Sequence, residues 1–167
     1  MSEMEEIGVE KAVVNIGVGD VGEDVEKAVD LLETLTGEQA VKTESTDAAQ
    51  GFGKRAGLNL GAKVTLRGEK AEEFLERVFD AKNHEMDDGV FDTQGNFSVG
   101  VGEYIDMPDA RYNPDIGMEG FDVAVVLERA GSRLKRRKEG GEVGKDQKVS
   151  EEEAKEFVKE RFGVELV

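Results

Sequence analysis

Hydrophobic residues recur along this chain with two periods, one typical of helices and the other typical of strands. Spacings of three and four residues predict amphipathic helices over residues 25–35, 71–79 and 154–162. Gly37 follows the first as a C-cap, and Ser150 caps the third in a capping box with Glu153. The positions predicted to face inward are Val25, Ala28, Val29, Leu32 and Leu35, then Ala71, Phe74, Leu75, Val78 and Phe79, then Ala154, Phe157, Val158 and Phe162.

Between these helices, short β-branched or alternating runs predict five strands. They cover residues 11–16, 41–43, 60–67, 97–101 and 121–127. In the third run, Lys63, Thr65 and Arg67 alternate with apolar residues and therefore lie on a wet face. One wet face per strand favours an α+β fold, a single domain over residues 1–167 whose largely antiparallel sheet has helices on one face only. The loops over residues 43–59, 82–96 and 102–120 are long, and long loops are often functional.

Composition excludes several classes of protein and site. The chain has 167 residues, enough to bury a core, and no cysteine, which excludes disulfides and thiolate metal sites. It contains no apolar run long enough to span a membrane, and its first residues, MSEMEEIG, are acidic where a signal peptide is basic and apolar. We therefore expect a cytoplasmic protein with no membrane partner.

The formal net charge of −16 is spread over amphipathic segments rather than collected in one acidic tail. Together with few aromatic residues and many glycines, this distribution suggests adaptation to a cytoplasm of high salt concentration, where self-repulsion is screened. Unfolding in molar KCl combined with stability in dilute buffer would contradict that interpretation.

One segment reverses this charge. Residues 133–138 hold five cations in six positions, and residues 129–148 carry eight basic against three acidic side chains. The rest of the chain carries 14 basic and 35 acidic ones. A local excess of cations in an acidic protein points to a polyanionic partner, with nucleic acid as the first candidate.

A glycine-rich turn offers a different interpretation. Residues 17–22 read G-x-G-x-x-G between a predicted strand and a predicted helix, which is the pattern of a dinucleotide-binding turn. Asp20, Glu23 and Asp24 would crowd the pyrophosphate, and the chain lacks the further βα units of a doubly wound sheet. A strand-to-helix turn that needs positive φ explains the glycines as well. A small dinucleotide-binding enzyme and an acidic protein-interaction module remain as alternatives.

Several motifs occur in an order that resembles one known family. They are residues 7–19 (IGVEKAVVNIGVG), 35–37 (LTG), 51–53 (GFG), 61–68 (GAKVTLRG), 91–92 with 95–98 (FD and GNFS), 112–117 (YNPDIG), 120–123 (GFDV) and 127–129 (LER), followed by the basic run. Together they resemble the archaeal form of the large-subunit ribosomal protein that binds 5S rRNA, the L-five family. The acidic surface would make this a halophile-like form.

The resemblance implies a structural constituent of the ribosome, with no catalytic residue, metal or cofactor. In that family the open sheet face and adjoining loops bind 5S rRNA in the central protuberance. The further partners implied are 23S rRNA and, through the loop after the second strand, P-site tRNA and a protein of the small-subunit head. In this chain that loop, residues 43–50, reads TESTDAAQ, and only Lys54 and Arg55 are basic before the next strand.

The residues expected to contact RNA are polar, cationic or glycine positions on these strands, turns and loops. They are Lys11, Asn15, Gly17, Gly19, Thr43, Lys54, Arg55, Lys63, Thr65, Arg67, Asn96, Ser98, Arg133, Lys135, Arg136, Arg137, Lys138, Lys145 and Lys148. Phe97 either stacks on a base or packs in the core, and the lone His84 is expected in a solvated loop.

Overall fold

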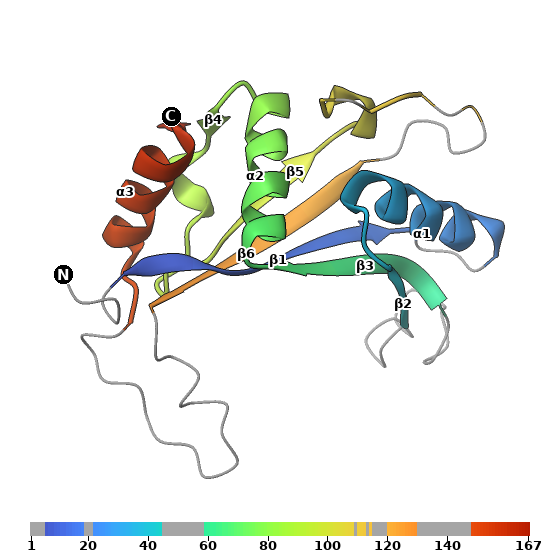
Figure 1. The fold of residues 1–167 in the computed structure, drawn as a ribbon, viewed down its shortest axis with the longest axis horizontal. Coiled ribbons are helices and arrows are strands. Elements are labelled where there is room, and N and C mark those ends of the chain that lie inside the picture. Colours follow the sequence, from blue (N-terminus) through green and yellow to red (C-terminus); the bar gives the residue numbers. More distant parts are fainter. Residues whose placement is uncertain are drawn as a thin grey trace, which may run out of the picture. The chain divides into compact units, whose positions relative to one another are not determined.

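The computed structural model describes residues 6–18, 22–44, 59–108, 110–112, 114, 120–129 and 148–167. The order of elements along the chain is shown in Figure 1. The elements are β1 (Ile7–Gly17), α1 (Glu23–Thr36), β2 (Val41–Glu44), β3 (Asn59–Arg67), α2 (Glu69–Ala81), β4 (Glu85–Met86), β5 (Phe97–Val101), β6 (Phe121–Arg129), α3 (Glu151–Phe162) and β7 (Glu165–Leu166), with short 3₁₀ turns at Asp88–Val90 and Tyr104–Asp106.

Five strands form one sheet in the order β2-β3-β1-β6-β5. Strands β2 and β3 pair antiparallel, with Thr43 opposite Gly61. A second, two-stranded sheet joins β4 to β7 in parallel. A mostly antiparallel five-stranded sheet with three helices confirms the α+β fold class.

The chain divides into two compact units. Unit 1 consists of Met1–Ala12, Arg67–Val99 and Ala124–Val167, and unit 2 consists of Val13–Leu66 and Gly100–Val123. Strand β1 passes from unit 1 into unit 2 after Ala12, and β6 passes back after Val123. A single domain over residues 1–167 stays a prediction.

In unit 2, helix α1 buries one apolar stripe. Val25, Ala28, Leu32 and Leu35 are buried as predicted, but Leu31 is buried while Val29 is only half-buried. The helix ends as expected at Gly37, in the left-handed conformation with φ of 72°, whose N–H donates to Glu33 O over 2.9 Å.

In unit 1, helices α2 and α3 enclose an aromatic cluster. The five predicted inward positions of α2 are all buried. The ring of Phe79 lies 5.2 Å from that of Phe162 and 6.5 Å from that of Phe97, measured between centroids, and Phe91 contacts Phe97. Phe97 is 4% exposed, so it belongs to the core and does not stack on a base.

Half of the predicted capping box is present at the start of α3. Ser150 Oγ accepts a hydrogen bond from Glu153 N at 3.3 Å. The Glu153 carboxylate, however, forms an ion pair with Arg129. Phe157, predicted to face inward, is only half-buried and contacts Phe162 edge-on.

Two differences between the predicted and the observed strands have a physical reason. Strand β1 begins at Ile7, whereas the prediction began at residue 11. The first residues were missed because the buried positions Val9 and Ala12 are three residues apart, which breaks the alternation expected of a strand. The predicted loop over 82–96 contains β4, whose pairing with β7 is held by Glu165 N donating to His84 O at 2.7 Å. His84 itself is half-exposed and pairs with Asp80.

Candidate nucleic-acid interface

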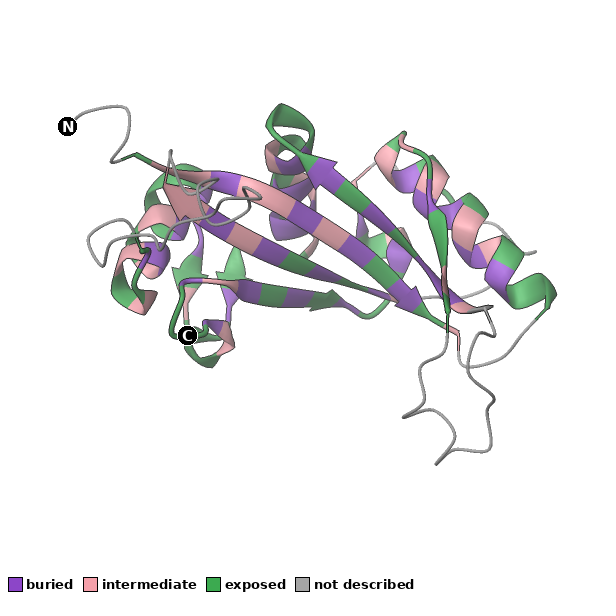
Figure 2. Ribbon diagram, turned by 90° about the horizontal axis from the view of Figure 1, so that it is seen from below, coloured by how far each residue is buried: buried purple, intermediate pink, exposed green. Residues whose placement is uncertain are grey.

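Each long strand of the large sheet has a buried side and an exposed side, visible as alternating colours in Figure 2. In β3, Ala62, Val64 and Leu66 are buried. The residues between them, Lys63, Thr65 and Arg67, are exposed, which confirms the predicted wet face of this strand.

In unit 2 the exposed sides of β1 and β3 are adjacent. Val18 N donates to Leu60 O at 2.9 Å, and a Cβ on Gly61 would lie 3.4 Å from Gly17 Cα. Residue numbers thus rise in one strand as they fall in the other, and this register places Asn15 opposite Lys63. Residues directly opposite each other project from the same side of a sheet, so both side chains lie on one face.

We call this exposed surface the open face of unit 2. Its exposed residues are Asn15, Gly17, Lys63, Thr65, Gly100 and Asp122. Lys63 takes part in none of the ion pairs between described residues, so its ammonium is available to an external anion. Thr43 is half-buried and close to Gly61: a Cβ placed on Gly61 would lie 2.8 Å from Thr43 Oγ1.

The predicted RNA contacts of unit 1 have different surroundings. Lys11 is half-buried, and Ser98 and Lys148 are exposed. Arg67 is exposed, but its Nη1 lies 2.8 Å from Glu10 Oε1, so a phosphate must compete with a carboxylate for this guanidinium. Asn96 is half-buried and its backbone is engaged with Asp92, through an Asp92 N to Asn96 O bond of 2.8 Å.

Nine further predicted contacts lie outside the described residues. They are Gly19, Lys54, Arg55, Arg133, Lys135, Arg136, Arg137, Lys138 and Lys145. The cationic run at residues 133–138 is therefore a feature of the sequence alone.

Charge is distributed unequally between helices and sheet. The three helices carry fifteen acidic and six basic side chains, a balance of −9. The five strands of the large sheet carry four acidic and five basic ones, a balance of +1. An anionic partner is therefore repelled by the helices much more than by the strands.

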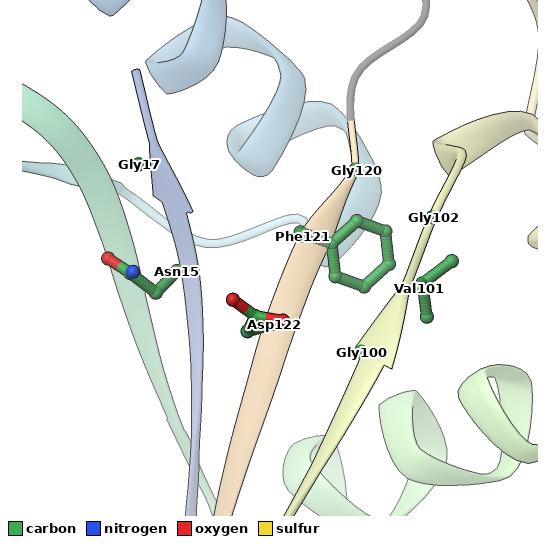
Figure 3. Close-up of a pocket in the computed structure, with 8 residues that line it drawn as sticks. All are labelled: Asn15, Gly17, Gly100, Val101, Gly102, Gly120, Phe121 and Asp122. Carbon is green, nitrogen blue, oxygen red and sulfur yellow. The ribbon is translucent and has the colours of Figure 1, made fainter. Parts of the chain in front are cut away.

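A hollow of about 410 Å³ opens on unit 2, lined by residues of β1, β5 and β6 and of the adjoining chain (Figure 3). Four of its eight lining residues are glycines, at positions 17, 100, 102 and 120. Its polar side chains are those of Asn15 and Asp122. A Cβ on Gly100 would lie 3.1 Å from Asp122 Oδ1, so the carboxylate leans over the neighbouring strand.

Gly120 has a structural reason to be glycine. A Cβ there would lie 2.6 Å from Gly102 O and 2.7 Å from Val101 O, where the chain entering β6 meets the end of β5. No such contact restricts Gly17 or Gly102, since nothing lies within 4 Å of a Cβ at either position. The space above these two glycines is open.

Sequence reasoning did not single out Asp122 or Gly100. The available signal was alternation, because Asp122 stands between Phe121 and Val123, two inward positions of a strongly apolar strand. A carboxylate on the wet side of such a strand is unusual, because acidic residues are depleted in strands.

The dinucleotide interpretation of residues 17–22 finds no support in the fold. Gly22 precedes α1 with φ of 122°, as expected for a strand-to-helix turn that only glycine adopts readily. The sheet that begins there is mostly antiparallel, whereas dinucleotide sites require a parallel, doubly wound sheet.

In the part of the chain that the structure describes, no cluster of three or more His, Cys, Asp or Glu residues could hold a metal ion. None of the helices described is long and apolar enough to cross a membrane.

In a comparison with known protein families, both halves of the sequence match models of ribosomal protein families. Residues 59–161 match the model of the C-terminus of the ribosomal L5 family. Residues 2–55 match the model of ribosomal protein L5.

Curated relatives match over essentially the whole chain. A protein of Sulfurisphaera tokodaii named large ribosomal subunit protein uL5 is 45% identical over 166 residues, covering 98% of this chain and 94% of the relative. Proteins of the same name from Methanoculleus marisnigri and Thermoplasma acidophilum are 42% and 41% identical, and each alignment covers at least 99% of both chains.

Proposed function

Because the chain belongs to the ribosomal protein L5 family of the large ribosomal subunit, a family of structural proteins and not of enzymes, we propose that it binds 5S rRNA. The contact is made by the open face of unit 2, and it helps to hold 5S rRNA in the central protuberance. The dinucleotide-binding enzyme considered from the sequence is thereby excluded.

The observation that carries the proposal is the uneven distribution of charge. The helices have a balance of −9, while the strands of the large sheet have a balance of +1. On the open face, Lys63 is exposed beside the uncharged polar side chains of Asn15 and Thr65. Among the described helices and strands, a polyanion therefore meets less repulsion from the strands that carry this face than from the helices.

The side chains of the open face match the chemistry of structured RNA. A lysine ammonium contributes most of the affinity through phosphate, while asparagine and threonine donate to and accept from sugar and phosphate oxygens. Folded RNA is recognised chiefly by shape and by 2′-hydroxyl groups, which suits a rigid strand surface without bulky side chains. Gly17 contributes by leaving its backbone open to close approach.

The remaining partners stay predictions. The loop after the second strand, residues 43–50, with the following Lys54 and Arg55, would reach P-site tRNA and a protein of the small-subunit head. The basic run at 133–138 would contact 5S or 23S rRNA. The acidity of the sequence, interpreted as adaptation to high salt, means that each phosphate contact is formed against strong competition from cations.

Filter binding of the purified protein to 5S rRNA over a range of KCl concentrations tests the proposal. We expect Lys63→Ala to weaken binding at least about tenfold at low salt, because it removes one charge-assisted hydrogen bond. The slope of log affinity against log salt should fall in magnitude by about 0.7 to 0.9, the contribution of one phosphate contact.

Lys159→Ala is the matched control, since it removes the same charge from an exposed position of α3. This variant should change affinity little. Equal losses from both variants would mean that RNA senses only the net charge, and no binding of the unmodified protein to 5S rRNA from dilute buffer to molar KCl would contradict the proposal.

A further inference from the structure

The hollow on unit 2 has a chemistry that phosphate binding does not explain. Its eight lining residues include no lysine, arginine or histidine, and its one charged side chain is Asp122. A carboxylate accepts hydrogen bonds and donates none, so it repels a phosphate and attracts a group with N–H donors.

We propose that this hollow binds the Watson–Crick edge of one unpaired guanine in the RNA, with Asp122 as the group that selects it. The inference rests on the proposed function and adds a base-reading site to it. Guanine presents the N1–H and N2–H₂ donors side by side, so the two carboxylate oxygens accept from both. Bidentate pairs of this kind give both strength and selectivity.

The glycines explain how a base reaches the carboxylate. Gly17 in β1, Gly100 in β5 and Gly102 just after β5 present no side chains, and nothing lies within 4 Å of a Cβ at Gly17 or Gly102. The volume of about 410 Å³ lies at the small end of the usual range for ligand sites, which suits a single nucleobase. Specific recognition of RNA uses such splayed-out bases, read along their Watson–Crick edges.

The two polar side chains of the hollow have distinct roles. Asp122 Oδ1 lies over Gly100, which has no Cβ to displace it. Asn15, on the neighbouring strand β1, has an amide that both donates and accepts, so it fits the remaining polar atoms of a purine or its ribose.

The surroundings favour a nucleotide over the arginine side chain of a protein partner. Lys63 lies on the same face, on strand β3, opposite Asn15, and it would oppose an approaching guanidinium. Strands β3 and β6 are separated by β1, so the strands that carry Lys63 and Asp122 run about 10 Å apart across the sheet. A nucleotide carries its anionic phosphate and its N–H donors at opposite ends, and it therefore matches both groups at once.

The sign of a charge deletion tests the inference. Removing a negative charge near RNA normally strengthens binding, because it reduces repulsion. We expect Asp122→Asn to weaken 5S rRNA binding by about five- to a hundredfold, since an amide cannot accept from both donors. Asp106→Asn, an exposed carboxylate of unit 2 outside the hollow, should leave binding unchanged or slightly tighter.

Footprinting with kethoxal, which modifies N1 and N2 of unpaired guanines, identifies the base. One guanine of 5S rRNA should be protected by the unmodified protein and by Asp106→Asn, and it should become reactive in the complex with Asp122→Asn. Circular dichroism of both variants checks that the exposed substitutions leave the fold intact.

The results separate this inference from the proposed function. Unchanged or tighter binding of Asp122→Asn, with no change in guanine reactivity, would overturn the base site while 5S rRNA binding stands. A second result would overturn the inference too, by assigning the hollow to an arginine side chain. In it, methylguanidinium chloride shifts the amide NMR signals of Gly100 and Asp122, while RNA binding is unaffected by Asp122→Asn. If 5S rRNA does not bind at all, both fail.

Discussion

Gly61→Ala is expected to push β3 away from its neighbours β1 and β2 in the sheet. Gly61 is buried in β3 and lies opposite Thr43 of β2. A methyl group there would lie 2.8 Å from Thr43 Oγ1 and closer still to the carbonyl oxygen of Ile16 in β1. The second of these atoms is backbone, so a change of side-chain rotamer cannot relieve the contact.

The size of the effect follows from these distances. An ordinary contact begins near 3.4 Å, so Thr43 Oγ1 and the new methyl must separate by about 0.6 Å, and Ile16 O must move further. The adjacent bond from Val18 N to Leu60 O, now 2.9 Å, would lengthen to the limit of a hydrogen bond.

Overpacking costs about 1–3 kcal/mol and the weakened hydrogen bond about 1 kcal/mol. The lower entropy of the unfolded alanine chain offsets about 0.4–1 kcal/mol. We therefore expect a loss of about 2–3 kcal/mol in the free energy of unfolding.

Thermal unfolding followed by circular dichroism measures this loss. For a chain of this length it corresponds to a fall in Tm of about 4–12 °C. Gly8→Ala is the matched control, because it makes the same change in β1 where nothing lies within 4 Å of the new Cβ. We expect that variant to stay within about 0.5 kcal/mol of the unmodified protein. Equal stability of the two variants would refute the reasoning.

Two further predictions concern unit 1. Phe79→Ala removes a fully buried ring from the aromatic cluster and should lower the free energy of unfolding in urea by about 3–5 kcal/mol. Phe157→Ala, at a half-buried position, should lower it clearly less. Equal losses would mean that the cluster is not the core of this unit. Hydrogen bonds to Glu151 and then Asp88 raise the pKa of Lys155 above its ordinary 10.5, so the stability from these pairs is fully present below that pH and is lost as pH rises through the higher folded pKa. When unfolding is measured between pH 9 and 12, Lys155→Met should therefore lose less stability with rising pH than the unmodified protein loses. Identical pH profiles of the two proteins would contradict this.

Local sequence patterns were sufficient to predict an element and its inward positions where that element has one buried face. The stripe of α2 was predicted at all five positions, and β5 was predicted with its observed bounds, Phe97–Val101. In both, every inward position is set by a single period, so no knowledge of neighbouring elements is needed.

The features that could not be predicted depend on residues far apart in sequence. The pairing of Arg67 with Glu10 joins positions 57 residues apart, and it decides how freely that cation meets RNA. The hollow is defined by glycines in β1 and β5 and in the chain next to β5 and β6, a property that no single strand reveals. Strands β4 and β7 have two residues each and exist only through their mutual pairing.

The division into two units has a consequence for the order of events during synthesis. The segments of unit 2 are complete once Val123 has been made, but unit 1 also needs residues 124–167, including the helix that closes its aromatic cluster. At about 5–20 residues per second, those 44 residues take about 2–9 s to translate. Because the chain leaves the ribosome in the order of its synthesis, the open face with Asn15, Lys63 and Asp122 can form outside it before Phe162 reaches the buried rings of unit 1. A nascent chain would thus have its proposed RNA-binding surface before it has its full stability.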